Sequence, residues 1–137
     1  MPAHRLNNVP IALYFATHFY FSTYHLFSNV LLRKVVTSYQ PGSLRSLLYV
    51  SVVLSFAYFT AFAETLTISA YPDYSFEDRN MAYTIGSAFY GIYFIVSFPA
   101  FIRFDDKIDD ANAPKVTVWD TVVSSCGHGM IIMILLD

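Results

Sequence analysis

The sequence predicts an all-α, polytopic membrane protein: an antiparallel bundle of four transmembrane helices within one membrane domain that spans residues 1–137. Apolar residues make up 55% of the chain and charged residues 13%, whereas soluble domains carry roughly 25% charged residues. A soluble domain of 137 residues has too much surface to cover with so few charges. The chain also contains four apolar runs, each long enough to cross a hydrocarbon core of about 30 Å.

The first two runs are predicted to form a helical hairpin. Residues 9–32 contain no Asp, Glu, Lys or Arg. Residues 47–68 carry one acid, Glu64, and follow Pro41-Gly42-Ser43, which is typical of a turn before a helix. Because the bilayer offers no water to backbone groups, membrane-crossing spans of about 20 residues must be helical.

The last two runs are predicted to form a second hairpin. Residues 81–102 are uncharged, and Pro99 near their end is expected to end or kink the helix. Residues 116–136 contain Asp120 and His128. Because the connections between the runs are short and polar, neighbouring helices should be antiparallel.

Basic residues predict the orientation of the bundle. Lysine- and arginine-rich connections stay on the cytoplasmic side of a membrane. Six of the eight Lys and Arg residues lie on one side, namely Arg33, Lys34, Arg45, Arg103, Lys107 and Lys115, against Arg5 and Arg79 on the other. We therefore expect both termini on the lumenal or outer side.

Polar side chains form a stripe along the first predicted helix. The stripe comprises Tyr14, His18, Ser22, His25 and Asn29, whose spacing of three or four residues places them on one face. Unsatisfied polar atoms in hydrocarbon cost several kcal/mol, so this face is expected to point into the bundle or a cavity. Its side chains are interhelical hydrogen-bond partners, catalytic or ligand-contacting groups, or ligands of a metal or pigment.

Glu64 is an acid inside a predicted span, and such a residue is by default a candidate functional residue. It lies near the lumenal end of its helix, at the predicted depth of Tyr14 and one turn above His18. Because removal from water favours the neutral form of a carboxyl group, Glu64 is a candidate proton donor. The alternatives are that its side chain reaches the membrane interface or pairs with Arg79.

Several local strings are shared with a known family. They are NNVP (residues 7–10), AETLTIS around Glu64, FEDR (residues 76–79) and, most specifically, YGIYFIVSFPAFIRFDDK (residues 90–107). Together they run over nearly the whole chain and resemble cycloeucalenol cycloisomerase. The resemblance implies a membrane-bound sterol enzyme of plants and algae, in the endoplasmic reticulum, that opens the cyclopropane ring of a 9β,19-cyclo sterol.

The implied reaction is proton transfer on an apolar ligand. Ring opening needs one proton delivered to carbon and a neighbouring proton removed, and it requires no cofactor and no metal. The groups able to move protons inside the bundle predict a catalytic set: Glu64 as donor, His18 and His25 as relay or accepting base, and Tyr14 at the level of Glu64. Aromatic faces, which are abundant in this chain, would stabilise the cation that forms.

Members of the family are longer, with hydrophobic segments ahead of the NNVP string. The chain is therefore expected to match their C-terminal part and to lack their N-terminal part. A second hypothesis stays open: a non-catalytic accessory subunit of a photosynthetic or respiratory complex, in a thylakoid or mitochondrial inner membrane. The expected partners are a sterol or another lipid, the membrane and other membrane protein chains. Nucleic acid is excluded, because a net charge of −2 provides no basic surface.

Overall fold

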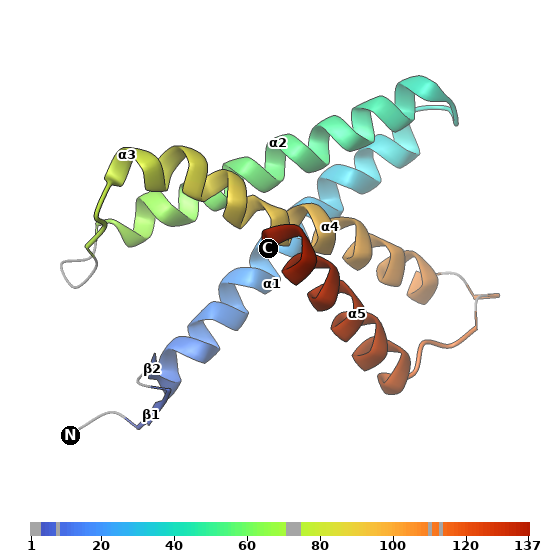
Figure 1. Ribbon diagram of the computed structural model, residues 1–137. Coiled ribbons are helices and arrows are strands. Elements are labelled where there is room, and N and C mark those ends of the chain that lie inside the picture. The colour runs from blue at the N-terminus through green and yellow to red at the C-terminus, as the bar shows by residue number, and fades with distance from the viewer. Residues whose placement is uncertain (1–3, 8, 71–74, 110, 113) are drawn as a thin grey trace.

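The computed structural model describes residues 4–7, 9–70, 75–109, 111–112 and 114–137. Within this part of the chain, long helices account for most residues, and consecutive long helices reverse direction (Figure 1). The elements are β1 (Arg5–Leu6), β2 (Val9–Pro10), α1 (Ile11–Ser38), α2 (Ser43–Ile68), α3 (Arg79–Met81), the π-helix η1 (Ala82–Gly86), α4 (Ser87–Asp109) and α5 (Val118–Leu136).

The N-terminal segment forms a small hairpin that the sequence did not predict. Strand β1 pairs antiparallel with β2, with Arg5 opposite Pro10. Asn7 has a φ of 50°, a left-handed conformation that asparagine adopts more readily than most residues. Because residues 9 and 10 pair with β1, the first helix begins at Ile11 and not at residue 9.

Helices α1 and α2 form the first predicted hairpin. Helix α1 continues to Ser38 and not to residue 32, so Arg33 and Lys34 lie within the helix. Both residues are good helix formers, and their long stems allow the charged ends to reach the membrane surface. Helix α2 begins directly after Gly42, earlier than residue 47, and ends at Ile68 as predicted.

The third predicted span is longer than expected at both ends. Its helical backbone runs from Arg79 through η1 to Asp109. Pro99 lies inside α4 and does not end it, since membrane helices tolerate proline where neighbouring groups satisfy the freed carbonyl. The π-helix was not predicted, because one wider turn leaves no clear mark in the pattern of apolar residues. Such turns frequently occur at functional sites.

Three helical segments within the described residues are long and apolar enough to cross a membrane: Ser43–Ile68, Arg79–Asp106 and Val118–Leu136. Helix α1 has 28 residues. A helix needs about 20 residues to cross a membrane, so α1 is long enough. Its Tyr, His, Ser and Thr side chains make it less apolar than the other three. The all-α prediction is confirmed apart from the small hairpin, and a fourth transmembrane helix is not confirmed.

The core lies where α1, α2 and α4 meet (Figure 1). Phe94 and Phe98 of α4 are the largest fully buried side chains, with 0% and 1% of their surface exposed. A Cβ at Gly91 would lie 3.6 Å from the carbonyl oxygen of Ala57, so α4 approaches the backbone of α2 closely there. The core residues are Leu32, Val53, Ala57, Ala61, Phe94, Phe98 and Ile102.

Two surfaces outside this core are apolar and exposed. Helix α5 packs along α4, and Ile132 is its one buried residue among the described positions (Figure 1). The N-terminal part of α1, from Ile11 to Tyr20, is exposed apart from the half-buried Ala16. Surfaces of this kind suit contact with lipid or with further helices.

Candidate active site

The polar stripe of α1 is divided between an exposed half and a packed half. Tyr14 and His18 are exposed, and the Tyr14 hydroxyl donates a hydrogen bond to the Leu6 carbonyl oxygen at 3.1 Å. His25 is half-buried and Asn29 is buried, and both contact α4. The structure therefore brings one of the two predicted histidines to the interior and places the other on the surface.

Glu64 lies where α2 packs against α4. Its Oε2 accepts a hydrogen bond from the Tyr90 hydroxyl at 3.0 Å, and both side chains are half-buried. Among the described residues, Glu64 forms no ion pair with Arg79, so Tyr90 takes the place of the partner considered from the sequence. A hydroxyl that donates to a carboxylate stabilises its negative charge, and Tyr90 thereby influences the acid chemistry of Glu64.

His25 and Ser97 form a second polar pair, which joins α1 to α4. Its Nδ1 lies 2.6 Å from the Phe21 carbonyl oxygen, and its Nε2 lies 2.9 Å from Oγ of Ser97. A carbonyl oxygen only accepts, so Nδ1 carries a hydrogen. In the neutral ring Nε2 then accepts the hydrogen bond that the Ser97 hydroxyl donates.

Phe94 joins the two polar pairs. Its buried ring lies 5.4 Å from that of Tyr90 and 6.5 Å from that of His25, measured between centroids. Tyr24 packs edge-on against the same ring at 5.8 Å. The steps from Tyr90 to Phe94 and on to Ser97 place these three on one face of α4. We call these six residues the Phe94 cluster: Tyr24, His25, Glu64, Tyr90, Phe94 and Ser97.

The sequence singled out two members of the Phe94 cluster, Glu64 and His25, and missed the others. With 11 Tyr and 13 Phe in the chain, no single aromatic residue stands out by its type. The spacing of three of these residues was the feature that could have indicated them. Tyr90, Phe94 and Ser97 lie at the i, i+4 and i+7 positions of one helix face. Tyr90 also opens the string YGIYFIVSFPAFIRFDDK.

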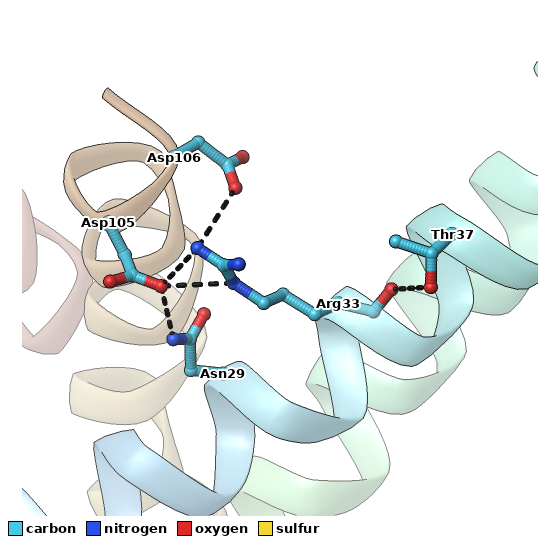
Figure 2. A network of polar contacts seen from close by, with 5 residues as sticks. All are labelled: Asn29, Arg33, Thr37, Asp105 and Asp106. Carbon is cyan, nitrogen blue, oxygen red and sulfur yellow. Dashed lines mark hydrogen bonds and ion pairs between the residues drawn. The ribbon is translucent and has the colours of Figure 1, made fainter. Parts of the chain in front are cut away.

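A second polar group joins α1 to α4 near the C-terminal end of α4 (Figure 2). Oδ2 of Asp105 accepts hydrogen bonds from Nδ2 of Asn29 at 2.5 Å and from Nε and Nη2 of Arg33 at 3.0 and 2.6 Å. We call Asn29, Arg33 and Asp105 the α1–α4 clamp. The sequence did not predict it, because the third span was expected to end at residue 102, before Asp105.

Asp105→Ala is expected to lower the free energy of unfolding by about 2 kcal/mol, because Arg33 and Asn29 lose their charged acceptor. Urea unfolding of the purified protein in detergent micelles, followed by circular dichroism, measures the change. Asp106→Ala is the matched control: Asp106 lies 3.8 Å from Arg33 and its side chain is 61% exposed. Its removal should cost less than about 1 kcal/mol, and equal losses for both variants would contradict the clamp.

Comparisons with known proteins agree with the local strings. No protein-family model matches the chain, and no solved structure matches it. Cycloeucalenol cycloisomerase from Arabidopsis thaliana is 40% identical to the chain over 141 aligned positions. The match covers 99% of this chain and 48% of that protein, so the chain spans about half the length of the relative. The predicted resemblance is therefore confirmed: this chain is similar, over nearly its whole length, to part of a cycloeucalenol cycloisomerase.

Proposed function

We propose that the chain supplies the proton-transfer site of a sterol isomerase that opens a cyclopropane ring. The observation that carries the proposal is the half-buried Glu64–Tyr90 pair, in a chain 40% identical to a cycloeucalenol cycloisomerase. A sterol is almost entirely apolar, and the aromatic side chains around this pair suit such a ligand. The endoplasmic reticulum membrane is the location proposed on the same basis.

Glu64 is proposed to deliver the proton. Its Oε2 accepts the hydrogen bond from Tyr90, and Oε1 is the oxygen proposed to carry the acidic proton. As the proton moves to a cyclopropane carbon, one ring bond breaks and negative charge develops on Glu64. The Tyr90 hydrogen bond strengthens as that charge develops, which stabilises the transition state. Tyr90 is thus a positioning residue for Glu64.

The second proton is proposed to return to Glu64. Ring opening leaves a carbocation, and the adjacent carbon must lose a proton to form the double bond. The Glu64 carboxylate that the first step forms beside the reacting carbons is the base proposed to accept it. One proton enters the sterol and one leaves, so the product is an isomer and no co-reactant is consumed. The aromatic faces proposed to stabilise the cation between the two steps are those of the buried Phe94 and the half-buried Tyr24.

His25 and Ser97 are proposed to bind the sterol hydroxyl. Ser97 lies two helical turns from Tyr90, about 10 Å along α4. The carbon that gains a proton and the carbon that loses one are both close to the cationic carbon, so this separation favours a binding role for His25 over the predicted role of accepting base. A sterol that lies along α4 would place its hydroxyl near Ser97 and its strained ring near Glu64.

Tyr14 and His18 remain predicted site residues. They lie on the exposed part of α1, at a distance in sequence from the packed members of the stripe. A ligand or further helices would have to cover this part of α1 before either residue could act in a water-free site. Nothing in the comparisons supports the alternative of an accessory subunit.

The test is complementation of a cell that lacks cycloeucalenol cycloisomerase and accumulates cyclopropyl sterols. One arm expresses this chain alone. The other expresses the Arabidopsis thaliana enzyme with its matching part, 48% of its length, replaced by this chain. Sterol profiling should show ring-opened product in at least one arm. Cyclopropyl sterol that persists in both arms, with both proteins present in the membrane fraction, would contradict the proposal.

A further inference from the structure

A cavity of about 230 Å³ lies between α4 and α5. It is on the α5 side of α4, whereas the Phe94 cluster is on the side that packs against α1 and α2. Pockets for drug-sized ligands measure about 300–1,000 Å³, so this cavity suits a smaller group and not a whole sterol. It is lined by Ala100, Arg103, Phe104, Asp120, Ser124 and His128.

Three polar residues of α5 line the cavity in a row. Asp120, Ser124 and His128 are spaced by four residues, so each lies one turn beyond the last. The row begins at the first turn of α5 and reaches about 12 Å along the helix. Asp120 also belongs to the capping box of α5: Thr117 is the N-cap, and Oδ2 of Asp120 accepts hydrogen bonds from the backbone N–H and the hydroxyl of Thr117.

Arg103 lines the same cavity from α4. Within the part of the chain that the structure describes, the side chains of Arg103, Ser124 and His128 have no hydrogen-bond partner in the protein. Polar groups in a membrane span cost several kcal/mol unless they are bonded. Arg103 is exposed, and Ser124 and His128 are half-buried, so all three side chains are able to bind a polar group from outside the chain.

One end of the cavity, at Arg103 and Asp120, lies near the ends of two segments that are long and apolar enough to cross a membrane. The segment that contains α4 ends at Asp106, one turn beyond Arg103. The segment formed by α5 begins at Val118, just before Asp120. A partner at this level is thus available from the bilayer itself.

We propose that this cavity binds the headgroup of a zwitterionic phospholipid, with the phosphate on Arg103, Ser124 and His128 and a primary ammonium beside Asp120. The planar guanidinium of arginine matches the geometry of a phosphate and donates two hydrogen bonds to it. The hydroxyl and the imidazole supply further donors along the row. This inference depends on membrane insertion and not on the sterol chemistry.

The two opposite charges that line the cavity favour a dipolar headgroup over an anionic one. Arg103 contributes a positive charge and the Asp120 carboxylate a negative charge. A headgroup with net negative charge would be repelled by Asp120. A phosphate with an attached ammonium complements both charges, and the N–H groups of a primary ammonium also donate hydrogen bonds to a carboxylate.

The test is lipid binding by the full chain, purified in detergent and studied by native mass spectrometry and thermal unfolding. Phosphatidylethanolamine, phosphatidylglycerol and inorganic phosphate are added separately. Phosphatidylethanolamine should bind at least tenfold more tightly than phosphatidylglycerol and should raise the unfolding temperature. Arg103→Gln should weaken that binding at least tenfold without unfolding the protein, because Arg103 is exposed.

Arg79→Gln is the matched control, since Arg79 is also exposed and lies at the other end of the helical segment that contains α4. It should leave binding unchanged, and His128→Ala should weaken binding with Arg103 intact. Equal binding by wild type and Arg103→Gln would overturn the site. Tighter binding of phosphatidylglycerol would overturn the zwitterionic assignment. If inorganic phosphate raised the unfolding temperature as much as phosphatidylethanolamine does, the site would bind a free anion, and the assignment to a lipid would be wrong.

Discussion

Glu64→Gln is expected to slow cyclopropane ring opening a hundredfold or more while the helices stay packed. Glutamine has nearly the same shape as glutamate, and its amide oxygen still accepts the hydrogen bond from Tyr90. It has no acidic proton to transfer, and loss of a general acid lowers a rate by about 10²–10⁴-fold. The measurement is conversion of a cyclopropyl sterol to its ring-opened isomer by membranes that contain equal amounts of wild type or variant.

Glu77→Gln is the matched control for this variant, because Glu77 is exposed and lies outside α2 and α4. Its rate should equal that of the wild type. Tyr90→Phe removes the hydroxyl that stabilises the Glu64 carboxylate and should lower the rate roughly tenfold with sterol binding retained. Full activity in Glu64→Gln would show that Glu64 is not the proton donor. The general acid of the proposed reaction would then be unidentified.

Membrane-crossing helices were predictable here because their main determinant is local. Residues 47–68 and 116–136 are apolar over the length a bilayer requires, and both became helices within a few residues of the predicted bounds. The errors arose where long-range contacts decide the end of a helix. Because Asp105 is charged, it was predicted to lie beyond the end of the third span. In the structure it lies within α4, where it accepts hydrogen bonds from Asn29 and Arg33 of α1.

The candidate site was predictable only in part, because its residues differ in how unusual they are for a membrane helix. Glu64 and His25 are rare types inside an apolar span, so each stood out without knowledge of the fold. Tyr90 and Ser97 are ordinary in such helices, and their importance follows from which residue each meets across a helix interface. Spacing within α4 fixes which residues share a face, but the register of α4 against α1 and α2 depends on packing around Gly91 and Phe94.

Phe94→Ala is expected to lower the free energy of unfolding by about 3–4 kcal/mol. The Phe94 ring is fully buried and contacts Phe21, Tyr24, Tyr90 and Phe98, with centroids 5.1–5.8 Å apart. In a membrane the gain from removing apolar surface from water is small, so the loss arises from the cavity left behind and from the broken aromatic contacts. Urea unfolding in detergent micelles measures the change.

Two further variants separate the packing role of Phe94 from its proposed role in stabilising the cation. Phe89→Ala, on the same helix, removes a ring that is 54% exposed and should cost less than about 1 kcal/mol. Phe94→Leu fills most of the same volume and should retain much of the stability, but it offers no aromatic face. Its ring-opening rate should therefore fall more than its stability does. A normal rate in Phe94→Leu would limit Phe94 to packing and leave Tyr24 as the aromatic face beside the cation.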